Sequence, residues 1–235
     1  MSKLKTVNKL NDLVVAPQVL VGGHGSRVLT LEDLSDDAYP LLTVVFTPVL
    51  CLIMTASAKA VTFFDAKTGG IHGTYDNSAI CGSPEILICS AVLDDRERKF
   101  IVGHSNGQIT VHNILNGATM KLIDPHQDQV SGMVYSKEAK SLISVSWDSC
   151  VHIANEEDND GWNERARQSV LMRKAKMQSP ATPNALVNHN DTVDFTGIAF
   201  SGLFNVFVTS ARGGAAPHHL HIWDFEFLKL RGTFV

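Results

Sequence analysis

The sequence predicts an all-β fold of about four four-stranded antiparallel sheets that follow one another along the chain. Four similar segments, each ending in Asp or Asn, are the first observation: Ala60–Asp65, Gln108–Asn113, Cys150–Asn155 and His219–Asp224. The first two intervals between these end residues lie close to the roughly 40–45 residues of a propeller blade, and the third is longer by an insertion. Turn residues separate the apolar runs, and the runs are rich in the Val, Ile, Thr and Phe that favour strands.

Strands in the first half of the chain are expected at 41–46, 50–55, 60–65 and 71–75, and then at 86–93, 99–103, 108–113 and 119–122. Asn106-Gly107 stands between two apolar runs, which is the strongest short-range signal for a hairpin. Gly69-Gly70 and Asn116-Gly117 follow Asp65 and Asn113 at similar offsets. A glycine there supplies the positive φ that the next turn requires.

In the second half, strands are expected at 130–135, 141–146 and 150–155, and then at 195–200, 205–210, 219–224 and 231–235. Asp148-Ser149 takes the hairpin place of Asn106-Gly107. Residues 156–188 form an insertion, with an acidic part followed by a basic part, 164–177, that lacks Gly and Pro and is interpreted as a loop or a short helix. A docking arm for an acidic partner and a solvated loop remain open, and cancelling charge favours the solvated loop.

The domain prediction is therefore an N-terminal segment or blade remnant at 1–34 and a repeat arc at 35–235. Its blades are expected at about 41–75, 86–122, 126–155 and 189–235, with the insertion at 156–188. Four sheets are too few to close a ring. Further repeats or self-association are expected to cover the open ends.

The composition is that of a globular protein. The 235 residues are 44% hydrophobic and 19% charged, with mean hydropathy +0.04, which excludes generic disorder, collagen and a coiled coil. The net charge of −4 gives no indication of a nucleic-acid partner. The four cysteines lack zinc-ligand spacing, and a reduced compartment suits them.

No membrane segment or signal peptide is expected. The first eleven residues are polar and basic, without an apolar stretch and cleavage site after them. Leu41–Met54 is too short to span a bilayer and contains Pro48. We interpret it as a pair of buried strands, and we expect a cytoplasmic protein.

The segment Trp223-Asp224 is the dipeptide that gives WD40 repeats their name, and the chain resembles that family. The resemblance implies a buried hydrogen-bonded chain of His, Ser or Thr, Asp and Trp in each blade. For the third blade the implied residues are His126, Ser144 and Asp148, with Ala154 in place of Trp. For the fourth they are His189, Thr209 and Trp223, followed by Asp224, and the turn at Ala211–His218 has no Asp.

A narrower resemblance, from about Leu41 to Val235, is to the EF-hand-containing WD-repeat proteins. It rests on four stretches: Leu93–Gly103, Leu115–Lys121, Ile143–Asp148 and Ile222–Phe227. Members of that group are generally longer, so the resemblance implies a fragment, a truncated gene model or a degenerate paralogue. It also implies a ciliary or cytoskeletal setting.

One motif suggests catalysis. Gly103-His-Ser-Asn-Gly107 matches the G-x-S-x-G nucleophile elbow, which requires a strand before the serine and a helix after it. The residues after Gly107 alternate as a strand does, so we interpret the motif as a hairpin. A hydrolase using Ser105 is the third alternative, and we expect no enzyme.

Metal and cofactor sites are not expected either. Glu156–Gly161 resembles half an EF-hand loop, but Arg167 stands where the bidentate Glu is required. His218, His219 and His221 lack matching further ligands. Gly22–Ser26 lacks the Lys of a phosphate-binding loop and the third glycine of a dinucleotide fingerprint.

The functional prediction is a non-enzymatic protein–protein interaction scaffold, inferred from fold and resemblance. Trp147 and Arg212 are the expected contact residues, because an aromatic side chain and an arginine on rigid turns make good anchors. The alternative is a calcium-regulated binding protein whose EF-hands lie outside this chain.

Overall fold

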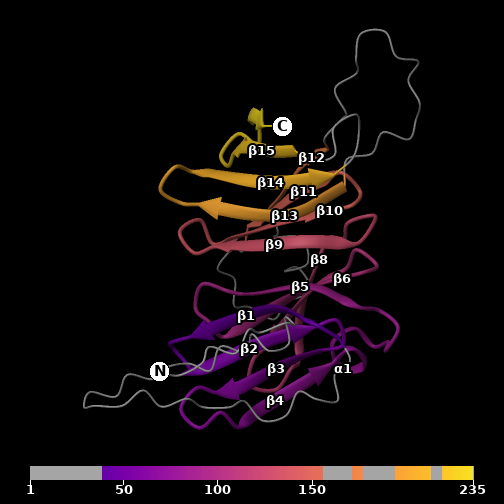
Figure 1. Cartoon of the computed structure of the whole chain (residues 1–235), viewed down its shortest axis with the longest axis vertical. Coiled ribbons are helices and arrows are strands. Elements are labelled where there is room, and N and C mark those ends of the chain that lie inside the picture. Colours follow the sequence, from indigo (N-terminus) through magenta and orange to yellow (C-terminus); the bar gives the residue numbers. More distant parts are fainter. Residues whose placement is uncertain (1–38, 156–170, 177–193, 213–218, 235) are drawn as a thin grey trace, which may run out of the picture.

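A computed structural model describes residues 39–155, 171–176, 194–212 and 219–234 (Figure 1). The first sheet consists of β1 (Leu41–Thr47), β2 (Leu52–Ser57), β3 (Ala60–Asp65) and β4 (Ile71–Asp76). The second consists of β5 (Ile88–Leu93), β6 (Lys99–His104), β7 (Ile109–Asn113) and β8 (Thr119–Ile123). The third consists of β9 (Val130–Ser136), β10 (Ser141–Ser146), β11 (Cys150–Asn155) and β12 (Leu171–Lys176). The fourth consists of β13 (Asp194–Ser201), β14 (Val206–Arg212), β15 (His219–Asp224) and β16 (Leu230–Phe234).

Each sheet is an antiparallel meander in chain order. The four sheets follow one another along the long axis of the molecule (Figure 1), and the first strands of neighbouring sheets contact each other. This is a partial, β-propeller-like arc. The prediction of an all-β fold with four four-stranded antiparallel sheets is confirmed.

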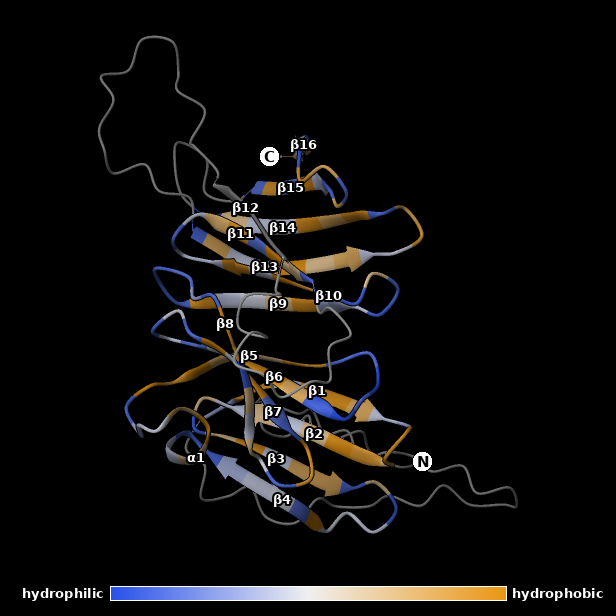
Figure 2. Cartoon of the chain, turned by 180° about the vertical axis from the view of Figure 1, so that it is seen from behind, coloured by the Kyte–Doolittle hydropathy of each residue, from blue (hydrophilic) through white to orange (hydrophobic). Residues whose placement is uncertain are grey.

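The core lies between the sheets as three apolar layers. The middle strands of the second and third sheets contribute to the layer on either side, so both of their faces are largely buried. The middle strands of the first sheet contribute to one layer, and Ile53, Phe64 and Ala66 form a small separate cluster. Apolar residues colour stretches of strand in all four sheets (Figure 2). Large residues fully buried in these layers include Met54, Phe63, Phe100, Ile109, Ile143, Ile153, Phe195 and Phe207.

The recurring Asp or Asn at the end of the third strand has a structural reason. Asp65 Oδ1 accepts hydrogen bonds from the backbone N–H groups of Lys67 and Thr68, both at 2.8 Å. In the same way, Asn113 Oδ1 accepts from the N–H of Leu115, and Asp224 Oδ1 accepts from the N–H of Phe227. Each side chain therefore closes the turn to the fourth strand, as Asx turns do.

Glycine is required where the hairpin of the second sheet meets the third sheet. Gly107 has φ +84°, and an added Cβ would lie 2.3 Å from the carbonyl oxygen of His126. The backbone N–H of His126 donates to the carbonyl of Gly107 at 3.0 Å. Asn106-Gly107 thus makes the predicted hairpin and also contacts the chain entering the next sheet.

The interpretation of residues 164–177 as a loop or short helix is wrong for its second half, which contains the strand β12. Leu171–Lys176 is a strand that pairs antiparallel with β11, from Cys150↔Lys176 to Asn155↔Leu171. The unpaired edge of β11 offers a ladder of backbone hydrogen bonds, which overrides a weak helix preference. The third sheet therefore extends beyond the expected boundary at 155. The rest of the insertion and the segment 1–34 lie outside the described residues.

A short helix, α1 (Asn77–Cys81), is a feature that the sequence reading did not anticipate. Asp76 caps it by accepting from the N–H of Ala79 at 2.8 Å, and Gly82 ends it with φ +75°. The segment Leu41–Met54 forms β1 and the start of β2, so the predicted pair of strands is present. Only β2 is buried as predicted, because Leu42, Val44 and Phe46 on one face of β1 are exposed. Within the described residues, no helix has the length and apolar character needed to cross a membrane.

Candidate interaction surface

A buried polar cluster fixes the turn between β10 and β11. Nδ1 of His126 lies 3.1 Å from Oδ2 of Asp148, and Nε2 lies 3.0 Å from Oγ of Ser144. A carboxylate can only accept, so Nδ1 carries the proton. Asp148 also accepts from the N–H groups of Gln127 and Cys150, each at 2.8 Å. The structure thus brings together His126, Ser144 and Asp148.

The charge of Asp148 is stabilised by these contacts. Burial by itself would raise its pKa, but the hydrogen bonds from His126 and from the two backbone N–H groups outweigh it and hold the pKa well below the ordinary value. The imidazole of His152 stacks on that of His126 with ring centroids 3.8 Å apart. The turn that carries Trp147 is therefore anchored on its inner side.

The fourth sheet contains one part of the implied chain. The indole Nε1 of Trp223 donates to Oγ1 of Thr209 at 2.9 Å, and both side chains are buried. Asp224 closes the following turn. His189 lies outside the described residues, as do residues 213–218 of the expanded turn.

The second sheet has a polar cluster that sequence reasoning missed. Oγ1 of Thr110 lies 2.9 Å from Nε2 of His104 and 2.7 Å from Nε2 of His112. Burial, and then the neighbouring His112, lower the pKa of His104 to about 4, so the ring is neutral at physiological pH. The sequence contains one signal for this cluster. His112 directly precedes the turn-closing Asn113, which is the position that Trp223 takes before Asp224.

Ser105 lies in the hairpin between β6 and β7, so the strand–turn–strand interpretation of the G-x-S-x-G motif is confirmed. Its Oγ accepts from the N–H of Leu87 at 3.0 Å, and its own N–H donates to the carbonyl of Leu87 at 2.8 Å. This reciprocal pair holds the linker before β5. Ser105 is thus engaged in a structural contact rather than presented at the start of a helix.

Trp147 directly follows β10 of the third sheet, and Arg212 is the last residue of β14 in the fourth sheet. Each residue therefore stands at the start of the turn that joins the second strand of its sheet to the third. Trp147 is 40% exposed, and its backbone N–H donates to the carbonyl of Gln129 at 3.2 Å. Arg212 is exposed, and its backbone lies opposite that of Asp194 in the register of β13 and β14. We call the side of the arc that carries these turns the Trp147 face.

The opposite side of the arc carries the turns that join first to second strands and third to fourth strands. Among the described residues, this side carries five large hydrophobic side chains that are 64% to 88% exposed: Val49, Leu115, Leu203, Phe204 and Phe227. The turns of the fourth sheet are joined by a hydrogen bond from the N–H of Phe225 to the carbonyl of Asn205 at 3.1 Å. The sequence signal was an apolar pair, Leu203-Phe204, inside a turn.

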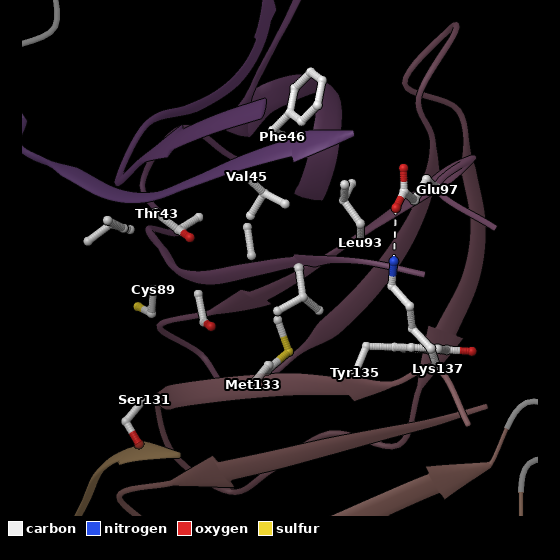
Figure 3. A pocket seen from close by; sticks show the side chains of 14 residues that line it. Thr43, Val45, Phe46, Cys89, Leu93, Glu97, Ser131, Met133, Tyr135 and Lys137 are labelled. Carbon is white, nitrogen blue, oxygen red and sulfur yellow. Dashed lines mark hydrogen bonds and ion pairs between the residues drawn. The ribbon is translucent and has the colours of Figure 1, made fainter. Parts of the chain in front are cut away.

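A groove of about 400 Å³ runs between β1, β5 and β9 (Figure 3). Val45, Leu93 and Met133 are among its apolar lining residues, and an ion pair of 2.8 Å between Glu97 and Lys137 stands at one side. Burial raises the pKa of the Cys89 thiol to about 11. The thiol is therefore protonated at neutral pH, unlike a reactive cysteine.

The remaining sequence candidates for metal or phosphate binding lie partly within the described residues. Among the described residues there is no group of three or more His, Cys, Asp or Glu side chains that could hold a metal ion. The rings of His219 and His221 stack 5.8 Å apart, and Nδ1 of His221 lies 3.1 Å from Oγ1 of Thr233. His218, the acidic stretch Glu156–Gly161, Arg167 and Gly22–Ser26 lie outside the described residues.

Comparison with known proteins gives one informative match. No family model matches this sequence. Over 136 residues, or 57% of the chain, it is 25% identical to the "Cilia- and flagella-associated protein 337 B" of Tetrahymena thermophila. The chain spans about a tenth of the length of that relative, since the match covers 10% of it.

Proposed function

We propose that this chain is a non-catalytic scaffold that binds other proteins, built on WD40 repeats and working in a ciliary or cytoskeletal assembly. The observation that carries the proposal is Trp147, a half-exposed indole on a turn held from both sides. Asp148 ties that turn to His126 and Gln127, and the N–H of Trp147 itself binds Gln129. A rigid aromatic side chain loses little entropy on binding, which is why such residues dominate protein interfaces.

The WD40 assignment within this proposal rests on two groups of contacts. His126 with Ser144 and Asp148, and Trp223 with Thr209, are pairs that the resemblance implies. The turn-closing Asp65, Asn113 and Asp224 support it further.

The ciliary setting rests on the named relative. That protein is cilia- and flagella-associated, and the chain matches only a small part of it. We infer a cytoplasmic location that includes the cilium, with proteins rather than nucleic acid or lipid as partners.

The experiment is fractionation of ciliated cells that express the tagged chain. We expect the wild type to remain with demembranated axonemes, and Trp147→Ala and Arg212→Ala each to reduce the bound fraction severalfold. Phe227→Ala is the matched control, because it removes an exposed aromatic side chain from the opposite side of the arc. The proposal fails if the wild type washes away completely, or if Phe227→Ala reduces binding as much as Trp147→Ala does.

A further inference from the structure

We propose that His104 and His112 form a pH-sensitive joint, in which protonation of His104 loosens the contact between the first and second sheets. Both histidines are 0% exposed, and Thr110, which bridges them, is 2% exposed. The inference does not depend on the proposed function, because it concerns the packing of two sheets rather than the Trp147 face.

The cluster lies on the face of the second sheet that meets the first sheet. His104 shares one face of β6 with Phe100, since alternate residues of a strand point the same way. The ring of Phe100 stacks on that of His112, with centroids 5.1 Å apart. It also contacts the rings of Phe63 and Tyr75 in the first sheet, at 5.4 and 5.6 Å. The first sheet therefore covers the histidines from water.

The hydrogen bonds of the cluster fix where each proton lies. Nδ1 of His112 is 3.1 Å from the carbonyl oxygen of Gly117, which only accepts, so Nδ1 carries the proton and Nε2 accepts. The donor to Nε2 is the hydroxyl of Thr110, at 2.7 Å. Oγ1 of Thr110 in turn accepts from Nε2 of His104, at 2.9 Å. Nδ1 of His104 is left as a buried acceptor without a hydrogen bond from any described residue.

A second proton on His104 must go to Nδ1, where the closed structure offers it no acceptor. The resulting charge is costly to bury, whereas water solvates it once the two sheets separate. Burial, and then His112, hold the pKa of His104 at about 4 in the closed structure. A solvated imidazole has a pKa of about 6.5. Separation is therefore favoured increasingly as pH falls from about 6.5 toward about 4.

The surroundings of His104 do not compensate its charge. Within the described part of the chain, no carboxylate binds its ring, and the titratable group that acts on it is His112. The other titratable side chains of the packed elements make contacts elsewhere: Lys59 with Pro84, Tyr75 with Ile114, Asp76 with Ala79, Cys81 with Asn77, Cys89 with Leu87, and Asp148 with His126.

Two hydrogen bonds between sheets serve as matched reporters. The backbone N–H of Ile88, which lies opposite His104 in the register of β5 and β6, donates to the carbonyl of Ala58 in the turn between β2 and β3 at 3.0 Å. The N–H of His126, where the chain enters the third sheet, donates to the carbonyl of Gly107 in the second sheet at 3.0 Å. Hydrogen exchange at Ile88 thus reports on the first contact between sheets, and exchange at His126 reports on the second.

The test is amide hydrogen exchange of the whole chain, resolved by residue with NMR, at about pH 7 and about pH 5.5, with each rate corrected for the intrinsic effect of pH. We expect the protection of Ile88 to fall severalfold on acidification and that of His126 to stay the same. His104→Gln should remove the fall, because the side-chain amide of Gln still donates to Thr110 but takes up no proton.

His72→Gln is the matched control, because His72 is an exposed histidine on β4 of the first sheet. This variant should lose protection at Ile88 as the wild type does. The proposal is overturned by unchanged protection of Ile88 in the wild type, by an equal fall at Ile88 and His126, or by a fall that persists in His104→Gln. If His104→Gln does not fold, the comparison of the two reporters in the wild type decides the proposal.

Discussion

At the scale of single residues, Asp148 is the side chain whose protonation affects stability most directly. Its contacts with His126, Gln127 and Cys150 hold its pKa below the ordinary value. A carboxyl group with a depressed folded-state pKa stabilises the fold above the unfolded-state pKa of about 3.9, and that contribution is lost as pH falls through the folded-state pKa. Acid should therefore remove this contribution progressively.

Asp148→Asn tests this reasoning. At pH 7 we expect the free energy of unfolding to fall by about 2 kcal/mol, because hydrogen bonds to a charged acceptor are replaced by weaker ones. Below about pH 4 the gap should narrow progressively, because the unfolded state then binds a proton that Asp148 in the folded state takes up only at lower pH. Urea unfolding across this pH range measures the gap, with the exposed Glu85→Gln as control. A gap that persists unchanged in acid would contradict the prediction.

Sequence reasoning reached some of these residues and missed others for a definable reason. His126, Ser144 and Asp148 were found because they match a motif with fixed spacing. His104, Thr110 and His112 form an equally buried cluster, but they replace that motif with a different set of side chains. No spacing rule describes such a substitution. Only the register Phe100↔His112 and Val102↔Thr110 places them together.

At the scale of elements, the strands were predictable because hydrophobic alternation and turn residues agree along the chain. The first-to-second-strand turns held a feature that the sequence concealed. Their residues with positive φ are not glycine: Cys51, Glu97, Lys140 and Asn205, with φ of 54°, 54°, 47° and 51°. The turns are thus shaped by the pairing strands, at a cost of about 1–2 kcal/mol for each L residue in this conformation.

Cys51→Gly should relieve one of these positions. We expect the variant to be more stable than Cys51→Ala by about 1 kcal/mol, because glycine adopts positive φ without a Cβ clash. Cys51→Ala is the matched control, since it also removes the thiol that lies 3.7 Å from the carbonyl of Pro48. Thermal unfolding of both variants gives the difference. Equal midpoints would show that the backbone at Cys51 is unstrained.

At the scale of the whole molecule, the order of the sheets followed from the sequence repeat, but the links between sheets did not. Glu97 makes one such link from the turn after β5. Its Oε2 accepts from the N–H of Val49 in the first sheet at 3.3 Å, and its Oε1 pairs with Nζ of Lys137 in the third at 2.8 Å. Burial would raise the pKa of Glu97, but the hydrogen bond from Lys137 and further donors lower it on balance. One carboxylate thus joins three sheets.

Two substitutions at Glu97 separate its two roles. Glu97→Gln keeps an acceptor for Val49 and removes the charge. It should cost at most about 1 kcal/mol, because Lys137 is largely exposed, and its effect should shrink in high salt. Glu97→Ala also leaves the N–H of Val49 without its acceptor and should cost about 2 kcal/mol.

The cooperativity of unfolding tests the link itself. In a stack of sheets, stability depends on the contacts between neighbours as well as on each sheet. If Glu97 couples the sheets, Glu97→Ala should lower the slope of the urea transition, because the first sheet then separates before the others. It should also speed hydrogen exchange at Val49. Glu138→Ala, in the equivalent turn of the third sheet, should leave the slope unchanged. A lowered midpoint with the wild-type slope would assign Glu97 a local role, because all sheets would still unfold together.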